Sequence, residues 1–189
     1  MSAQKFTSLK NHFLLAMPGL QDPNFTQAVI YICEHSEEGA MGLAINHPID
    51  VPMSRVFEEM QLAYPSRLGK RPLLCGGPVQ RERGFILHKT SAGHWESTME
   101  ISPDVSITAS RDILCDIASE KGPEDSYITL GYAGWGPGQL EEELANNSWL
   151  TIPADPDIIF SIPFDQRARA TAAKIGVDID RLSSQAGHA

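Results

Sequence analysis

The side chains of this sequence that could do chemistry stand where apolar segments end. Glu34 and His35 directly follow one such segment, and Asn46 follows the next one. A carboxylate beside an imidazole suits general acid–base work or metal ligation. Solvation in a loop or a local hydrogen bond accounts for the same residues equally well. Both interpretations stay open, and the structural one ranks first.

Polar residues at two further places have both a structural and a functional interpretation. Asp22 and Asn24 flank Pro23, and residues of these types form turns by bonding the backbone, a role that we rank above contact with a ligand. His88 ends another apolar segment, where a structural histidine with satisfied hydrogen bonds is the leading interpretation. In both places the functional alternative is a side chain that faces a ligand.

Two glycine-rich segments could bring the backbone close to an anion. Gly76 and Gly77 permit positive φ and exposed N–H groups, although most such pairs are turns. The segment Gly131–Gly138 is predicted to be a turn that leads from a strand into a helix, which is an anion-binding geometry. Three glutamates, 141–143, occupy the first turns of that helix and would repel a phosphate. The structural interpretation therefore ranks higher, with the glutamates mostly in solvent.

Established catalytic signatures are absent. The dinucleotide fingerprint fails because Gln139 stands at its third glycine position, and Arg71 stands where a phosphate loop needs Ser or Thr. The chain contains no G-x-S-x-G, H-E-x-x-H or EF-hand pattern. The sequence therefore assigns no catalytic residue, no metal ligand and no cofactor.

The three cysteines do not form a C-x-x-C pair. Cys33, Cys75 and Cys115 lie far apart, and each directly follows an apolar residue. We expect three small buried hydrophobic side chains rather than a zinc or redox site. A reducing cytoplasm suits this pattern.

Length and charge exclude several classes of protein. The 189 residues suit one domain over 1–189, and 15 basic against 24 acidic residues give a net charge of −9. This charge opposes non-specific binding to nucleic acid and to anionic lipid. No apolar run approaches the ~20 residues of a membrane span, and Met1–Leu9 lacks the apolar core of a signal peptide. We expect a cytoplasmic protein without membrane contact.

Strands and helices are mixed along the chain. Apolar runs predict strands over 13–15, 28–33, 40–45, 73–75, 85–88, 127–132, 149–152 and 158–162. Residues 34–39 connect a hairpin, and alternation over 99–109 predicts another with one exposed face. Helices are predicted around Met53–Met60, after Ser110 as cap, from Pro137 to Asn146, and after Asp165 as N-cap until Gly176. The pattern predicts an α+β fold with a mainly antiparallel or mixed sheet, curled into a partial barrel.

Several long blocks of the chain, in order along it, carry a family similarity: His12-Phe13-Leu14, Met17 to Phe25, Tyr31 to His35, Gly39 to Gly42, Asn46, Gly76 to Val79, Arg83 to His88, Ser110 to Asp112, Gly131 to Trp135, Gly138 to Glu141, Trp149 to Thr151, Pro153 to Asp155 and Ala186-Gly187-His188-Ala189. These blocks resemble the YqgE/AlgH family of bacterial proteins. The chain departs from the family at His47, often Arg or Lys there, and at Gly136, commonly Glu.

The resemblance implies one α+β domain, with a bifurcated sheet folded into a pseudo-barrel and helices packed outside. It implies no established activity, so there is no catalytic set to transfer. Some members carry a label as transcriptional regulators, but that label brings no mapped DNA-binding residues.

Our leading hypothesis is a non-enzymatic binding or regulatory module for a small molecule or a protein partner. It requires the polar strand ends to converge on one rim of the barrel. The candidate ligand-binding residues are Asp22, Asn24, Glu34, His35, Asn46, Gly76, Gly77, His88, Gly134 and Trp135. The alternative is a hydrolytic or metal-assisted enzyme that uses Glu34 and His35 with Asp22 or His88. A regulator that binds DNA directly is a third hypothesis, which the charge of −9 opposes.

Overall fold

Ten strands form one continuous, curled sheet. The structure is a computed structural model that describes residues 6–185, so the closing Ala186–Ala189 of the family motif and the start of the Met1–Leu9 segment lie outside the described residues. The strands are β1 (His12–Ala16), β2 (Val29–Ser36), β3 (Gly39–Ala44), β4 (Pro48–Pro52), β5 (Pro72–Cys75), β6 (Val79–Lys89), β7 (Thr98–Glu100), β8 (Val105–Thr108), β9 (Ser126–Trp135) and β10 (Trp149–Pro153).

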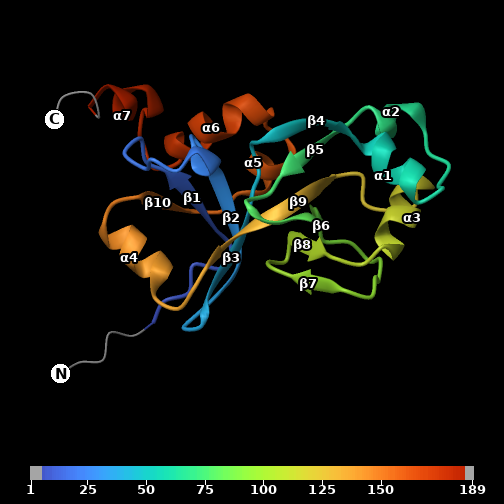
Figure 1. The fold of residues 1–189 in the computed structure, drawn as a ribbon, viewed down its shortest axis with the longest axis horizontal. Helices are drawn as coiled ribbons and strands as arrows, with labels where there is room; N and C mark the ends of the chain where they lie inside the picture. The colour runs from blue at the N-terminus through green and yellow to red at the C-terminus, as the bar shows by residue number, and fades with distance from the viewer. Residues whose placement is uncertain (1–5, 186–189) are drawn as a thin grey trace.

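Seven helices and two 3₁₀ turns surround the sheet within the described residues. The helices are α1 (Met53–Glu59), α2 (Ser66–Gly69), α3 (Asp112–Ala118), α4 (Gln139–Ala145), α5 (Pro156–Phe160), α6 (Arg167–Ala173) and α7 (Ile179–Gln185), and the turns are η1 (Pro23–Phe25) and η2 (Phe164–Gln166). Helices α1, α2 and α3 lie together at one end of the molecule, while α4, α6 and α7 lie around the other (Figure 1).

The strand order is β10-β1-β2-β3-β9-β6-β8-β7, with β5 beside β9 and β4 beside β5. Every pair is antiparallel except β5 with β9. The sheet curls into a half-barrel with helices packed outside, so the predicted α+β class with a mainly antiparallel curled sheet is confirmed.

Strand β9 joins the two halves of the sheet. Its first part pairs with β6 and β5, and its last three residues pair with β3. Gly131 divides the two parts with a φ of 72°. A Cβ on Gly131 would lie 2.4 Å from the carbonyl oxygen of Gly77, and one on Gly77 would lie 2.2 Å from the backbone of Tyr132. The backbone at Gly77 therefore lies directly against the backbone of β9. Only glycine permits this close approach, because any other residue would place a Cβ between the two segments.

Buried side chains on both faces of the sheet explain the continuous apolar runs. Along β2, Val29 and Tyr31 belong to the main core inside the half-barrel, which also takes in α5 and α6. Ile30 and Ile32 belong to a second cluster, under α4. A third cluster fills the space between the sheet and α1, α2 and α3. The prediction that residues 28–33 form a strand buried on both faces is confirmed.

Several predicted elements need correction. Residues 158–162 are not a strand, because Asp155 caps α5 and Pro156 occupies its first turn. Residues 133–135, predicted as part of a turn, extend the predicted strand 127–132 and form the last part of β9. The face of 99–109 expected to be exposed is covered in β8, where Val105–Thr108 are all buried.

The predicted helix caps also differ from those observed. Ser110 does not cap α3; its hydroxyl donates to the Asp112 carboxylate instead. Asp165 lies in η2, and α6 follows directly after Gln166. Helix α7, beyond Gly176, was not predicted.

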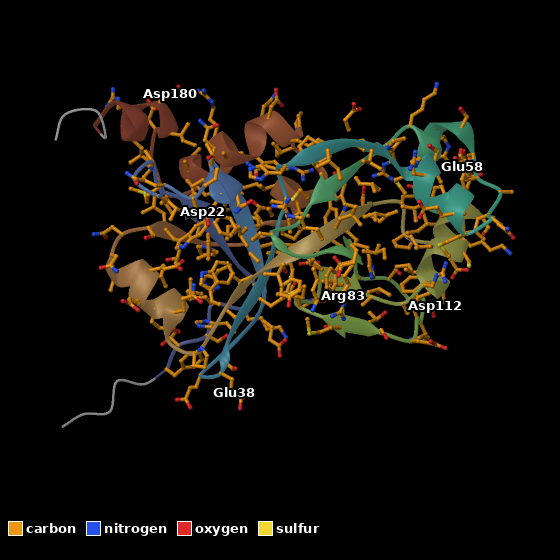
Figure 2. All side chains as sticks on the ribbon, viewed as in Figure 1. Asp22, Glu38, Glu58, Arg83, Asp112 and Asp180 are labelled. Atoms are coloured by element: carbon orange, nitrogen blue, oxygen red, sulfur yellow. The ribbon has the colours of Figure 1, made fainter. Side chains whose placement is uncertain are left out.

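The first hairpin is tighter than the predicted six-residue connection. Ser36 pairs with Gly39 across β2 and β3, which leaves Glu37 and Glu38 as the loop. Figure 2 shows Glu38 at the hairpin tip. Glu34 and His35 are therefore residues of a strand and not of a loop.

The close approach of Gly77 to β9 gives a testable consequence for stability. We expect Gly77→Ala to lower the free energy of unfolding by about 3 kcal/mol or more, because the new Cβ meets backbone that has no room to move. The matched control is Gly84→Ala in β6, where a Cβ would meet nothing within 4 Å and the change should stay within about 0.5 kcal/mol. Urea unfolding of both variants measures the difference, and equal effects would contradict the packing argument.

Candidate functional site

A groove opens between the β2–β3 hairpin and strands β6, β7 and β8. Its volume is about 350 Å³, and strands β2, β3, β6, β7, β8 and β9 each contribute a lining residue. The lining residues are Glu34, Met41, Arg83, Phe85, Ser97, Met99, Ile107, Ala109 and Tyr132. Most of its apolar residues belong to or pack against the main core, so the groove is the place where that core reaches the surface.

The groove combines an adaptable apolar floor with two opposite charges. Met41 and Met99 are half-buried, and thioether side chains adjust their shape to different ligands. Glu34 and Arg83 are exposed, and the guanidinium carbon of Arg83 lies 4.9 Å from the centre of the Phe85 ring. Figure 2 marks the position of Arg83. The ionisable side chains of the lining are Glu34, Arg83 and Tyr132.

Glu34 and His35 point to opposite faces of the sheet, because successive side chains of a strand alternate. Glu34 is exposed at the groove, in register with Met41 of β3, which pairs in turn with Gly134 of β9. His35 is 7% exposed and stands on the α4 side of the sheet. The acid–base pair that adjacency in sequence suggested is therefore not formed.

His35 holds three segments together. The Leu9 N–H donates to its Nδ1 at 2.9 Å, so the ring proton is on Nε2, which donates to the Glu141 carboxylate at 2.7 Å. Its own carbonyl accepts a hydrogen bond from the Ser8 hydroxyl. The N-terminal segment, β2 and α4 thus meet at one imidazole.

Two glutamates of α4 form hydrogen bonds, although Glu141 and Glu142 are exposed as expected and Glu143 is half-buried. Glu141 holds His35, and Glu143 accepts hydrogen bonds from the indole N–H groups of Trp135 and Trp149, at 2.9 and 2.8 Å. Trp135 is 6% exposed and packs in the cluster under α4. Its ring packs between the sheet and α4.

The turn-forming residues behave as their types predict. The Asp22 carboxylate accepts from the backbone and side-chain N–H groups of Asn24. Asn24 in turn accepts from Arg81 at 3.0 Å. Asn46 accepts from the Val29 N–H and donates to the Gln27 carbonyl, which fixes the chain between η1 and β2.

His88 is a buried link in a chain of hydrogen bonds. It is 1% exposed; its Nδ1 donates to the Lys89 carbonyl at 2.9 Å, and its Nε2 accepts from the Thr108 hydroxyl at 2.8 Å. Burial lowers the pKa of His88, and the hydrogen bond to Lys89 only partly opposes this shift. Burial therefore favours the neutral form of the ring in the folded protein.

The ten candidate residues do not share one rim. Glu34 lines the groove, with Gly134 in the same row, whereas His35 and Trp135 lie on the opposite face and His88 lies inside β6–β8. Gly76 and Gly77 pack against β9, and the Gly76 N–H donates to the Leu130 carbonyl. Across residues 6–182, no three His, Cys, Asp or Glu side chains stand close enough to hold a metal ion, so Glu34, His35, Asp22 and His88 do not form the metal site of the enzyme hypothesis.

The groove residues that sequence reasoning missed are apolar. Met41, Met99, Phe85 and Ile107 look like ordinary core positions, because only the curl of the sheet brings them to one opening. Arg83 stands out in the sequence only as the first residue of the family block Arg83 to His88.

Only one cysteine is fully buried. Cys33 is in the main core, and burial raises the pKa of its thiol. Cys75 is half-buried and Cys115 is exposed on α3, which corrects the expectation of three buried side chains.

Residues 13–180 match the family model described as AlgH-like. The chain belongs to the AlgH-like family. A UPF0301 protein of Saccharophagus degradans is 53% identical over 188 residues, which is 100% of this chain and 92% of the relative. A UPF0301 protein of Thioalkalivibrio sulfidiphilus is 52% identical over 183 residues, which is 97% of this chain and 98% of the relative. The resemblance drawn from the sequence is confirmed.

Solved structures show the same fold. The solution structure of the AlgH protein from Pseudomonas aeruginosa matches with a TM-score of 0.80 and 48% identity, over 100% of both chains. A crystal structure of a protein from Corynebacterium diphtheriae matches with a TM-score of 0.74 and 21% identity, over 96% of this chain and 95% of that one. The second shares the fold alone. Within the part of the chain that the structure describes, no helix is long and apolar enough to cross a membrane.

Because hydrogen bonds of His35 link the N-terminal segment, β2 and α4, we expect its removal to destabilise the folded protein. His35→Ala should lower the free energy of unfolding by about 2–3 kcal/mol, because two hydrogen bonds are lost and the Leu9 N–H and Glu141 lose their partner. The exposed His94→Ala is the control, with an expected change below about 0.5 kcal/mol. Denaturant unfolding gives both values; a small effect at His35 would show that these links are not needed.

The lowered pKa of His88 predicts a pH-dependent stability. Below its ordinary value of 6.5 the unfolded chain takes up a proton that the folded protein resists, so stability should fall as the pH drops through 6.5. Thermal unfolding across this range measures the slope, which His88→Gln should reduce. His47, whose pKa burial also lowers, accounts for part of the remainder, and the exposed His94→Gln should leave the slope unchanged. Equal slopes in wild type and His88→Gln would contradict the assignment.

Proposed function

We propose that this chain is a non-enzymatic binding module, one domain over 1–189, whose groove between the β2–β3 hairpin and β6–β8 takes a ligand. The single observation that carries the proposal is an opening of the main core lined by two methionines and by two opposite charges. Protein cores are normally closed off by close-packed side chains, whereas a binding site needs an opening that a ligand can enter.

The lining indicates the chemical class of the ligand. Met41, Met99 and Tyr132 offer contact to an apolar body, and Arg83 and Glu34 offer polar anchors at the surface. A small amphipathic molecule, or an apolar side chain of a protein partner with polar neighbours, fits this combination. The volume of about 350 Å³ is at the lower end of the range for small-molecule sites.

Binding of nucleic acid is not part of the proposal, because the net charge of −9 repels phosphates. We place the protein in the cytoplasm. Its three cysteines are all free, which suits a reducing compartment.

The six methionines of the chain provide the test. With ¹³C-methyl-labelled methionine, a small-molecule library is titrated while every methyl signal is followed. We expect binders to move the signals of Met41 and Met99 together, because both line the groove. Met53, the first residue of α1 and buried in the cluster between the sheet and α1–α3, is the internal control and should not move.

Matched arginine variants separate the groove from its surroundings. Arg83→Gln should weaken an acidic binder by about ten-fold, because it removes the charged anchor. Arg81→Gln changes an equally exposed arginine that bonds Asn24 and should leave the affinity unchanged. Binders that leave Met41 and Met99 unshifted, or equal losses in the two variants, would refute the proposal.

A further inference from the structure

A buried arginine without an acidic partner lies outside the groove. Arg167, on α6, is 1% exposed and is among the largest fully buried side chains. It donates to the carbonyls of Ile162 and Ile45 and to the Tyr127 hydroxyl, the last at 2.8 Å. Among the ion pairs of the described residues none includes Arg167. A buried cation is normally paired with a carboxylate, so this site lacks its expected counter-charge.

The hydrogen-bond count of this guanidinium is incomplete. A guanidinium has five N–H groups, and the three bonds above use one each on Nε, Nη1 and Nη2. One N–H on each terminal nitrogen is therefore left for a ligand. Two such donors on neighbouring nitrogens match the two oxygens of a carboxylate.

A cavity of about 640 Å³ adjoins this guanidinium. It lies between β9, β4 and the α5–α6 segment, and its walls include the rings of Tyr127, Phe160 and Phe164. The Tyr127 and Phe160 rings are stacked 6.1 Å apart, centre to centre. This size suits a small organic molecule, and the aromatic walls suit an apolar or aromatic body.

The charges around the cavity favour an anion at its inner end. A second arginine, Arg71, lies 5.7 Å from the Tyr127 ring, and the Lys89 ammonium lies 5.8 Å from the Phe160 ring, although Lys89 already pairs with Asp125. The acidic lining residue is Asp165, which is exposed. Asp165 disfavours a second negative charge near the entrance, which selects ligands with a single carboxylate.

We propose that this cavity binds a small monocarboxylate with an apolar or aromatic body, its carboxylate on Arg167 and its body against the Tyr127 and Phe160 rings. The Phe164 ring, centred 4.5 Å from the guanidinium carbon, and the Tyr127 ring, centred 4.9 Å from it, lie over the arginine. The same chemistry is offered by a free metabolite and by the C-terminal carboxylate of a protein. The proposal is independent of the groove.

The test compares a charged probe with its neutral counterpart. Phenylacetate and phenylacetamide are titrated into the full-length protein, with binding measured by calorimetry and located by backbone amide shifts. We expect phenylacetate to bind and to shift residues 160–167, and phenylacetamide to bind about ten-fold more weakly or not at all. A peptide ending in phenylalanine, with a free or an amidated terminus, distinguishes a chain terminus from a free small molecule as the preferred source of the carboxylate.

Variants at Arg167 and at its neighbours test the proposal further, and those that retain Arg167 still do so if removal of the arginine prevents folding. Arg167→Met should abolish phenylacetate binding. Phe164→Ala removes the covering ring and should tighten the binding of acetate, which has no body to lose contacts. The exposed Asp165→Asn should tighten the binding of phenylacetate, whereas the exposed Glu59→Gln, on α1, should not change it. Equal binding of acid and amide, persistence in Arg167→Met, or no carboxylate binding by wild type and Phe164→Ala would overturn the proposal.

Discussion

The close packing of glycine backbone at the middle of β9 is the constraint on which the rest of this structure depends. Gly76 donates its N–H to the Leu130 carbonyl and accepts from the Ala44 N–H, so one residue links β5, β9 and the end of β3. Gly131 gives β9 the left-handed bend that turns it from one partner to another. Without this crossing, visible at the centre of Figure 1, the two halves of the sheet would not share an interior.

The curl that follows from this crossing places both candidate sites on the same strand. Strand β9 contributes Tyr132 to the groove and Tyr127 to the cavity beside Arg167. The two openings have different chemistry. The groove has a flexible floor with exposed charges of both signs, while the cavity has rigid aromatic walls and one desolvated cation. A single scaffold therefore offers an adaptable surface and a selective one.

Most polar residues that drew attention in the sequence stabilise the fold. His35 joins the N-terminal segment to α4, Asn46 fixes the chain before β2, and His88 completes a buried chain of hydroxyl groups. A buried polar group without a partner destabilises a protein, so polar residues beside apolar strands usually form hydrogen bonds within the fold. What remains for binding is Glu34, Arg83 and the apolar side chains between them.

The sequence by itself determined the class of the fold, the buried strands, the first hairpin and the family, because apolar runs, turn residues and ordered motifs are local signals. It also identified Glu34 as a candidate. Only the tertiary structure decided that Glu34 and His35 face opposite sides, that residues 133–135 continue a strand, and that Met41 and Met99 line one groove. These outcomes depend on pairing between strands far apart in the chain, and a one-residue change of register reverses which face a side chain takes. The same holds for Arg167, whose burial against Ile45 and Tyr127 brings together segments that no local pattern connects.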